Sequence, residues 1–459
     1  MSRNKKRGLL KRLQWGVECS GFLVLERLGA FFTMPSLWRA GAGLAVVARL
    51  FSSRWAIVRS NLRTAVGPTT SEEDISVLTR EVFRHTAANL LTALKSAQLP
   101  SPLVREVLAP ENIEVFERAF GKGKGVILVC AHMGNFELLA QGLGAFRPEI
   151  RIASIYRPLN NIYLDTIIRE RRAHRGMKLF AKLTSYHGPI KWVRNQGVLG
   201  IVADQRAGRS GSITPFFGRL MSMSPLPAFI HKHTGAPIIG ISMKTTSPGR
   251  WKVAFHELEI SEGEDVTTAH IAALLETIVT RSIVDVFWMQ DLWRMNIKRP
   301  LEIPGREGPI RLQGDRNKPL YPFSILVRVP DNEQEFAQTI PALTALAHSR
   351  PDCDLHLLAR ERIRDDANSS GVAHTFHSIE GNKLPPGLIL AIAFTDHERT
   401  ARELAHLYAG PTYTLPAAMQ SRENWHSIPI EESLSPEARW LGLARSLGMH
   451  DPPLQWTYV

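Results

Sequence analysis

From about residue 125, short apolar runs alternate with longer segments in which apolar residues recur every three or four positions. The runs at 125–131, 150–156 and 198–204 are apolar almost throughout, which is typical of strands buried on both faces. The segment 162–176 has helical spacing instead. This alternation predicts an α/β fold with a mixed, largely parallel sheet flanked by helices.

The pattern divides the chain into an N-terminal region, two α/β domains and a linker. Residues 56–300 form the first predicted domain, which begins with helices and ends with a helix at 267–286. Residues 301–320 are rich in Gly, Pro and charge without periodicity, as linkers are. Residues 321–459 are predicted to form a small α/β domain, because apolar runs at 323–330 and 353–359 flank a helical pattern.

Residues 1–55 begin with a cluster of Lys and Arg and continue with a mainly apolar region. Its longest uncharged run, 28–38, has eleven residues, whereas a spanning helix needs roughly 20. Glu18 and Glu26 interrupt the apolar region, which also argues against a signal peptide. We expect helices that associate with an anionic membrane surface. The alternative is a set of ordinary core helices behind a solvated basic tail.

Charge and cysteine content narrow the functional classes. The net charge of +13 divides into +17 for residues 1–310 and −4 for residues 311–459. The basic part suits an anionic partner. Charge alone leaves four classes of partner open: a nucleic acid, an acidic lipid, a phosphorylated substrate and an acidic carrier protein. The three cysteines form no CxxC pair, so neither a disulfide framework nor a thiolate metal site is predicted.

The stretch VILVCAHMGNFELL, residues 126–139, carries the first candidate chemistry. Residues five apart on one helix are rotated by about 140° and do not share a face. His132 and Glu137 can meet if His132 lies on a turn and Glu137 in the first turn of the next helix. Gly134 permits such a turn, and Asn135 can cap the helix. The carboxylate would then orient the imidazole and make its other nitrogen a better base.

A histidine five positions before a glutamate is by itself common, and an ordinary structural histidine beside a surface glutamate explains most such matches. Here, however, CAHMGNFELL resembles the H-x4-D/E motif of the glycerolipid acyltransferase superfamily. Further stretches resemble, in order, its lipid A late-acyltransferase branch, the lauroyl and myristoyl transferases. These stretches are RWAIVRSNLRTAVG (54–67), YRPLNNIYLDTIIRERRAHRG (156–176), VADQRAGRSGSITPFFGRLM (202–221) and HTGAPII (233–239). The resemblance covers roughly residues 10–300.

The resemblance implies an O-acyltransferase at the cytoplasmic face of the bacterial inner membrane, peripheral or monotopic. His132 would be the general base and Glu137 its orienting carboxylate. The acceptor would be a hydroxyl of a phosphorylated glucosamine-based lipid, and the donor a fatty-acyl thioester on acyl carrier protein or coenzyme A. The transfer would be direct, because Cys130 is expected to point into the sheet rather than act as a nucleophile. No metal or other cofactor is expected, because no histidine has metal-ligand spacing with a carboxylate or thiolate nearby and the family is not known for a metal.

Four further residues are expected to bind substrate, as is Asn135. Arg157 and Arg172 match positions that the family uses near its site, and a guanidinium suits a lipid phosphate or a developing oxyanion. Arg172 is alternatively one charge on a solvated helix face. Asp204 and Gln205 end a predicted strand and are expected to face the pocket. A cap of a helix or turn is the other interpretation of Asp204.

Two features leave alternatives open. Residues 325–359 resemble the opening βαβ unit of heptosyltransferase-type glycosyltransferases, but lack the glycine-containing loop after the first strand and too few residues follow for a second half. We therefore expect a truncated half without glycosyl transfer.

For the whole chain, the alternatives are acylation of another membrane lipid, such as a phosphatidylinositol mannoside or an ornithine-type lipid, and a non-catalytic membrane- or nucleic-acid-binding protein. The absence of a nucleic-acid motif argues against nucleic acid as a partner.

Overall fold

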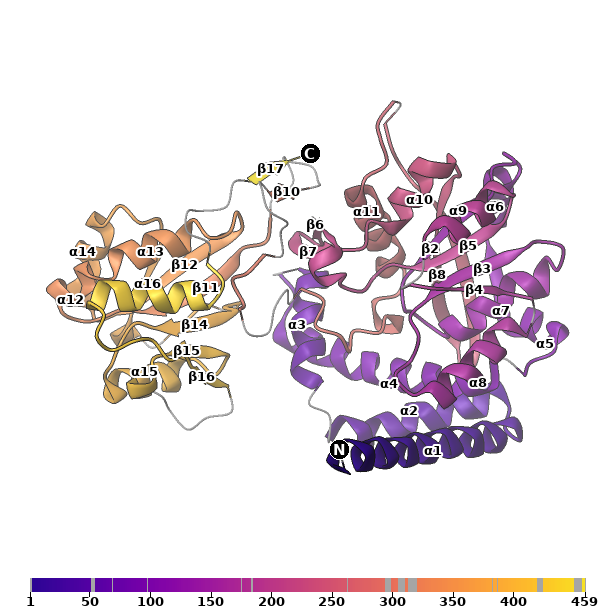
Figure 1. Ribbon diagram of the computed structural model, residues 1–459, viewed down its shortest axis with the longest axis horizontal. Coiled ribbons are helices and arrows are strands. Elements are labelled where there is room, and N and C mark those ends of the chain that lie inside the picture. The colour runs from indigo at the N-terminus through magenta and orange to yellow at the C-terminus, as the bar shows by residue number, and fades with distance from the viewer. Residues whose placement is uncertain are drawn as a thin grey trace. The chain divides into compact units, whose positions relative to one another are not determined.

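The computed structural model describes residues 2–458 except 51–53, 68, 97, 175, 183–184, 262, 294–298, 304–309, 313–319, 382, 386, 419–423 and 450–455. Contacts divide the chain into two compact units (Figure 1). Unit 1 comprises Met1–Ala207 and Met223–Leu292, and unit 2 comprises Gly208–Ser222 and Trp293–Val459. The short segment Gly208–Ser222 therefore leaves the first unit and packs with the C-terminal part of the chain.

Unit 1 contains a seven-stranded sheet in the order β1-β9-β8-β2-β5-β3-β4. All neighbouring strands are parallel except β8 and β9, so the prediction of a mixed, largely parallel sheet is confirmed. The strands are β1 Leu108–Glu111, β2 Val126–Cys130, β3 Ile152–Tyr156, β4 Lys178–Ala181, β5 Val198–Val202, β8 Ile238–Ser247 and β9 Arg250–Glu257. The edge strands β1 and β4 are short and have no clear apolar pattern, and the sequence did not indicate them.

Helices cover both faces of this sheet. They are α5 Ser101–Val107, α6 Ile113–Phe120, α7 Phe136–Phe146, α8 Ile162–Ala173, α9 His187–Arg194, α10 Leu226–Thr234 and α11 Thr268–Thr280. Successive strand residues point to opposite faces, and β8 illustrates the result. A Cβ on Gly240 would meet Leu274 and Ile278 of α11, whereas its neighbour Ile241 lines a cavity beneath α7. Helices α7 and α11 therefore lie on opposite faces of the sheet.

Four N-terminal helices precede this sheet: α1 Ser2–Ala30, α2 Met34–Leu50, α3 Trp55–Val66 and α4 Glu72–Ser96. Helices α2 and α4 approach closely at Gly41, where a Cβ would lie 2.6 Å from the Cα of Ala88. Within the described residues, none of the helices combines the length and the apolar character needed to cross a bilayer.

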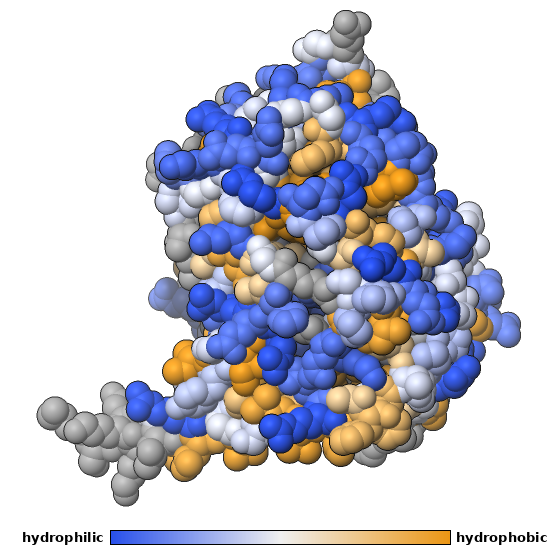
Figure 2. All heavy atoms as spheres, turned by 90° about the vertical axis from the view of Figure 1, so that its right-hand side faces the viewer, coloured by the Kyte–Doolittle hydropathy of each residue, from blue (hydrophilic) through white to orange (hydrophobic). Residues whose placement is uncertain are grey.

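Helix α1 presents a row of apolar side chains to solvent. We define the α1 stripe as Leu10, Leu13, Val17, Val24 and Leu28, which are 53–74% exposed. At 100° per residue these positions lie within about 60° of one another. Apolar atoms gather along the lower edge of Figure 2, the level at which Figure 1 draws α1 and α2. The predicted membrane association of this region stays a prediction.

Unit 2 contains a six-stranded, all-parallel sheet in the order β13-β12-β11-β14-β15-β16. Its strands are β11 Phe323–Arg328, β12 Cys353–Ala359, β13 Thr375–Ser378, β14 Leu390–Ala393, β15 Thr412–Thr414 and β16 Trp425–Ser427. Its helices are α12 Glu333–Ala337, α13 Ile340–Ala347, α14 Arg364–Ser369, α15 Glu398–Leu407 and α16 Pro436–Ser446. The sequence indicated only the first βαβ unit, because the later strands have three or four residues each.

A two-stranded hairpin, β6 Ser212–Phe216 and β7 Arg219–Met223, forms part of unit 2 together with the paired strands β10 Ile310–Leu312 and β17 Trp456–Tyr458. Ile213 and Leu220 of the hairpin share a small apolar core with Ile303 and Leu312. Part of the segment expected to be a linker, 301–320, is thus buried rather than solvated.

Candidate active site

The candidate site lies where two neighbouring parallel strands end. Strands β2 and β5 pair so that Cys130 is opposite Val202, and the N–H of Ala203 continues the pairing by donating to the carbonyl of Cys130 at 3.0 Å. His132 and Asp204 each lie two residues beyond this last pair. The same register therefore brings them side by side at the carboxyl edge of the sheet, where α/β folds place ligands.

Asp204 contacts both the ring and the backbone of His132. Its Oδ1 lies 2.7 Å from Nδ1 of the ring, and its Oδ2 accepts the backbone N–H at 2.8 Å. The side chain of Asp204 is only 8% exposed, against 22% for His132. A carboxylate only accepts, so Nδ1 carries the hydrogen of this bond and Nε2 of the neutral ring keeps its lone pair. This pair has the geometry of an oriented general base.

The expected contact between Glu137 and the imidazole is therefore replaced by a contact with Asp204. Glu137 does lie in the first turn of α7, as predicted, but its two oxygens accept from Nε and Nη2 of Arg172 at 2.9 and 2.5 Å. Asn135 caps the helix, since its side-chain oxygen accepts the N–H of Leu138 at 3.0 Å. Glu137 does not reach the imidazole because its carboxylate extends toward α8, where Arg172 lies, rather than toward the end of β2.

The surroundings of His132 stabilise the protonated imidazole relative to the same ring in water. Burial lowers the pKa of His132, but the charge of Asp204 and the hydrogen bond to it outweigh burial, and the charge of Glu137 adds to them. The pKa of His132 therefore lies above its ordinary value. The pKa of Arg172 is also raised, because the hydrogen bond and charge of Glu137 outweigh the opposing effect of burial. Arg172 is a permanent cation beside the site.

Two other predicted residues differ in their relation to this pair. Nε2 of Gln205 lies 3.3 Å from Nε2 and 3.4 Å from Nδ1 of His132, so the amide lies beside the ring, about equally far from both nitrogens. Arg157 follows β3 at the same edge, but its side chain is exposed and takes part in none of the ion pairs found among the described residues. The structure thus brings together His132, Asp204 and Gln205. Glu137 and Arg172 pair with each other near this group, and their charges act on the pKa of His132.

Asp285, which no motif or spacing in the sequence indicates, anchors the loop that carries His132. The carbonyl of Asp285 accepts the N–H of Gly134 at 2.9 Å, and the N–H of Phe287 donates to the carbonyl of His132 at 2.8 Å. The partners of its buried carboxylate are His85, Asn89, Thr245 and Ser282. Burial raises the pKa of Asp285, but the hydrogen bond and charge of His85 outweigh burial and lower it.

A largely apolar cavity of about 320 Å³ lies between α7 and the sheet. Phe136, at the start of α7, lines it and also packs edge-on against the His132 ring, with 5.3 Å between the centroids. Phe146, Arg147 and Glu117 line it at the other end of the helix. The volume falls within the roughly 300–1,000 Å³ of small-molecule sites. The cavity thus extends along α7 from the candidate base.

Cys130 also lines this cavity. Burial raises the pKa of its thiol to about 12, and the charge of Asp204 acts in the same direction. A thiol with so high a pKa is a poor nucleophile near neutral pH. The prediction that Cys130 is not the nucleophile therefore agrees with its surroundings.

In unit 2, charged side chains of the protein itself occupy the carboxyl edge of the sheet. The strand order reverses between β11 and β14, which is where sheets of this topology bind ligands. Arg328, the last residue of β11, is fully buried there, with Nη2 at 2.7 Å from Asp331 and 3.3 Å from Glu403. Arg360 also pairs with Glu403, at 3.0 Å. This network occupies the position expected of a glycine-containing loop.

Comparison with known proteins gives two kinds of match. The family model for bacterial lipid A biosynthesis acyltransferases matches residues 5–295. A lipid A biosynthesis palmitoleoyltransferase of Escherichia coli (strain K12) is 24% identical over 261 residues, which are 56% of this chain and 84% of that protein. A lipid A biosynthesis acyltransferase of Shigella flexneri matches with the same identity and coverage.

Among solved structures, an E. coli heptosyltransferase, WaaC with ADP, is similar over 29% of this chain and 49% of that chain. The sequence identity is 15% and the TM-score 0.25. The match spans about half of the heptosyltransferase. The resemblance of the C-terminal segment to a glycosyltransferase half stays a prediction.

Proposed function

Because the chain belongs to the bacterial lipid A biosynthesis acyltransferase family, we propose that it transfers a fatty acyl chain from a thioester to a hydroxyl of a lipid A precursor. The observation that supports this most directly is the pairing of His132 with the buried Asp204, next to an apolar cavity. A hydroxyl is a poor nucleophile, so a positioned base is the first requirement of the reaction.

In the proposed reaction, Nε2 of His132 takes the proton of the acceptor hydroxyl as its oxygen attacks the thioester carbonyl. The carbonyl becomes a tetrahedral oxyanion, which collapses by breaking the carbon–sulfur bond. The thiolate leaves and takes up the proton held by Nε2. Asp204 stabilises the imidazolium that exists between these steps, since its carboxylate remains hydrogen-bonded to Nδ1. General base catalysis of this kind supplies about 10²- to 10⁴-fold.

Glu137 has a positioning role in this proposal rather than a direct contact with the base. It holds the guanidinium of Arg172 by two hydrogen bonds and so fixes a positive charge near the reacting groups. A cation there favours a phosphorylated acceptor and the developing oxyanion. The amide of Gln205 is a neutral donor beside the base and suits the oxygen of either substrate.

The cavity beneath α7 is the proposed site for the donated acyl chain. Its wall is mainly aliphatic and aromatic, and burying a chain there yields about 0.8 kcal/mol per methylene. A partly exposed ion pair between Arg147 and Glu117 lines its far end. Apolar binding along α7 would place the thioester end of the chain near Phe136 and His132.

The proposed partners are an acyl carrier protein, or coenzyme A, as donor and a phosphorylated glycolipid as acceptor. An acidic carrier and an anionic lipid both suit a region with a net charge of +17. The proposed location is the cytoplasmic face of the bacterial inner membrane, with the α1 stripe in contact with the bilayer.

Mass spectrometry of lipid A from cells with and without the gene tests the proposal. We expect a mass difference of one acyl chain, restored by the wild-type gene and not by His132→Ala. A complementary assay supplies purified protein with an acyl-carrier-protein thioester and a lipid A precursor. An unchanged lipid A profile together with altered phosphatidylinositol mannosides or ornithine lipids contradicts the acceptor, and activity that survives His132→Ala contradicts the base.

A further inference from the structure

Helix α4 carries a row of polar side chains that face the interior of unit 1. We define the α4 polar row as His85, Asn89, Thr92 and Ser96. Successive members are four, three and four residues apart, so they lie along one side of the helix. Asn89, Thr92 and Ser96 are buried, and the side chain of His85 is 14% exposed. Burying a polar group costs free energy unless it is hydrogen-bonded, so the row indicates a network of hydrogen bonds inside the protein.

The first two members of the row bind the carboxylate of Asp285. Nδ1 of His85 lies 2.8 Å from its Oδ1, and Nδ2 of Asn89 donates to the same oxygen at 3.2 Å. Oδ2 accepts the backbone N–H of Thr245 at 2.8 Å and the hydroxyl of Ser282 at 2.7 Å. The side chain of Asp285 has no exposed surface. Helix α4 and strand β8 therefore fix where Asp285 lies.

The last two members of the row bind Asn135, the residue that caps α7. Nδ2 of Asn135 donates to the hydroxyl of Thr92 at 3.2 Å, and Oδ1 of Asn135 accepts the hydroxyl of Ser96 at 3.1 Å. The same oxygen accepts the N–H of Leu138 as the cap of the helix. The side chain of Asn135 is thus held by α4 as well as by its own helix.

The α4 polar row in this way holds both ends of the turn that carries His132. At one end, the backbone carbonyl of Asp285 accepts the N–H of Gly134 at 2.9 Å, and the N–H of Phe287 donates to the carbonyl of His132 at 2.8 Å. At the other end, the row holds the side chain of Asn135 directly. The base stands between these two attachments, so α4 determines where its backbone lies.

We propose that Asp285 is a positioning residue for acyl transfer, because it fixes the backbone of His132 so that the imidazole stays against Asp204. This role rests on the proposed function, whereas the geometry behind it does not. Asp204 binds His132 at two points, since its oxygens meet Nδ1 at 2.7 Å and the backbone N–H at 2.8 Å. A shift of the turn by about 1 Å lengthens both contacts beyond hydrogen-bonding distance and leaves the ring without its orienting carboxylate.

The groups around Asp285 explain why this position suits a carboxylate. His85, Asn89, Ser282 and both the backbone and the hydroxyl of Thr245 direct hydrogens at it, and a carboxylate only accepts. An asparagine has nearly the same size but turns the hydrogens of its amide toward some of these donors. Asp285→Asn therefore keeps the volume of the side chain and disrupts its attachment to α4 and β8.

Asp285→Asn should lower kcat on the order of 10²-fold, which is the effect of displacing a reacting group by about 1 Å. Both KM values should stay nearly unchanged, because the side chain is buried and does not line the cavity beneath α7. Steady-state kinetics with an acyl thioester and a lipid A precursor measure all three constants. An unchanged kcat in the folded variant overturns the proposal.

The pH profile separates positioning from a loss of stability. Burial lowers the pKa of His132, but the charge of Asp204 and the hydrogen bond to it outweigh burial. Glu137 raises the pKa further, and Arg172 lowers it. A looser contact with Asp204 lowers the pKa of the ring, so the acid limb of kcat/KM should move to lower pH in Asp285→Asn. A variant that is merely less stable has fewer active molecules and keeps the limb in place, and that result overturns the proposal.

Thr92→Val tests the other end of the α4 polar row and serves as the second variant if Asp285→Asn does not fold. It removes the hydroxyl that accepts from Asn135 at nearly constant volume. The acid limb should move in the same direction as in Asp285→Asn, but by less. A limb that stays at its wild-type position in Thr92→Val overturns the part assigned to the row.

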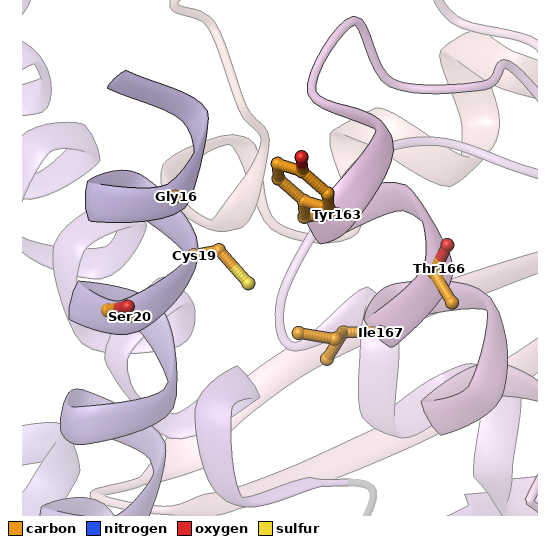
Figure 3. Close-up of a pocket in the computed structure, with 6 residues that line it drawn as sticks. All are labelled: Gly16, Cys19, Ser20, Tyr163, Thr166 and Ile167. Atoms are coloured by element: carbon orange, nitrogen blue, oxygen red, sulfur yellow. The ribbon is translucent and has the colours of Figure 1, made fainter. Parts of the chain in front are cut away.

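Two control variants carry the same substitution where it has no connection to the turn. Thr79 is buried in α4, and its hydroxyl donates to a carbonyl of that helix. Thr166 belongs to α8, and Figure 3 shows it among the residues that line a hollow between α1 and α8. Thr79→Val and Thr166→Val should keep the wild-type acid limb. A shift in either control as large as that in Thr92→Val contradicts a specific role of the row.

NMR of protein with isotope-labelled histidine measures the pKa of His132 without substrate, and the signal is identified by its loss in His132→Gln. A lower pKa in Asp285→Asn than in the wild type supports the positioning role even if the wild-type protein transfers no acyl chain, which would contradict the proposed function alone. Equal pKa values in the two proteins overturn the positioning role whether or not the wild type is active.

Discussion

At the scale of single residues, His132 has a different partner from the one that motif spacing suggests. The spacing predicts that His132, on the turn after a strand, meets Glu137 in the first turn of the next helix, and the predicted helix start at Asn135 and Phe136 is confirmed. The ring, however, meets Asp204 from the neighbouring strand. The sequence does carry a signal for this contact, because His132 and Asp204 each stand two residues after the end of an apolar strand. The contact could be predicted from that position only if β2 and β5 were known to be neighbours in the sheet.

The two carboxylates are therefore expected to differ in what they do. Asp204→Asn places a donor or a weak acceptor against Nδ1, which disturbs the tautomer, and should lower kcat by about 10²- to 10⁴-fold. Glu137→Gln keeps the shape and leaves Arg172 less firmly held, so it should mainly raise the KM for the phosphorylated acceptor. Steady-state kinetics of both variants decide. A larger loss of kcat in Glu137→Gln than in Asp204→Asn contradicts the assignment.

The pH dependence follows from the raised pKa of His132. The neutral ring is the active base, so kcat/KM should fall as the pH decreases through this pKa and level off above it. Asp204→Asn removes the charge that raises the pKa, while burial still lowers it. The acid limb of the remaining activity should therefore move to lower pH. A limb that stays in place, or moves to higher pH, shows that Asp204 does not control the titration of the base.

At the scale of elements, the apolar cavity depends on how α7 lies over the sheet. The sequence predicted the helix and the strands beneath it but not the space between them, since a cavity arises from small residues on different elements that face one another. Gly142 of α7 and Gly200 of β5 both line it. A Cβ at Gly200 would lie 3.7 Å from the nearest atom, the carbonyl oxygen of Ala153, so a side chain fits there without strain of the strand.

Filling the cavity at this position should change the preferred length of the donor chain. Gly200→Val places two methyl groups in the cavity, and kcat/KM for the longest accepted acyl thioester should fall roughly tenfold or more, while shorter donors are affected less. Gly200→Ala is the matched control and should have a small effect. Competition between thioesters of different length gives the ratio directly. Equal losses for all chain lengths contradict the placement of the acyl chain.

At the scale of the whole molecule, charge and exposed apolar surface are concentrated on the N-terminal part of the chain. The basic residues were evident from composition. The α1 stripe was not, because the same helix also carries Glu18 and Glu26 and its apolar pattern is weak. The structure shows that Glu26 is buried against Arg171 of α8 and that Glu18 accepts a hydrogen bond from Asn161, the cap of α8, so neither carboxylate interrupts the α1 stripe.

Replacing Leu13, Val17 and Val24 together by serine should weaken binding to phosphatidylglycerol vesicles at least tenfold, because each side chain contributes about 1.5 kcal/mol or more when buried. Vesicle co-sedimentation at several salt concentrations measures it, and the wild-type affinity should decrease with salt. Val77 and Leu90 of α4 are also exposed, at 43% and 46%, and their replacement by serine is the control. Equal binding by both variants contradicts membrane contact through α1.

The sequence alone determined the α/β class, the main strands and helices and the candidate base, because these depend on local periodicity and on motifs within one stretch of chain. Only the tertiary structure decided which carboxylate orients His132, that Asp285 anchors its loop, and that residues 208–222 pack with unit 2. Each of these results depends on strand order and on contacts between residues distant in sequence, and neither leaves a periodic signal along the chain.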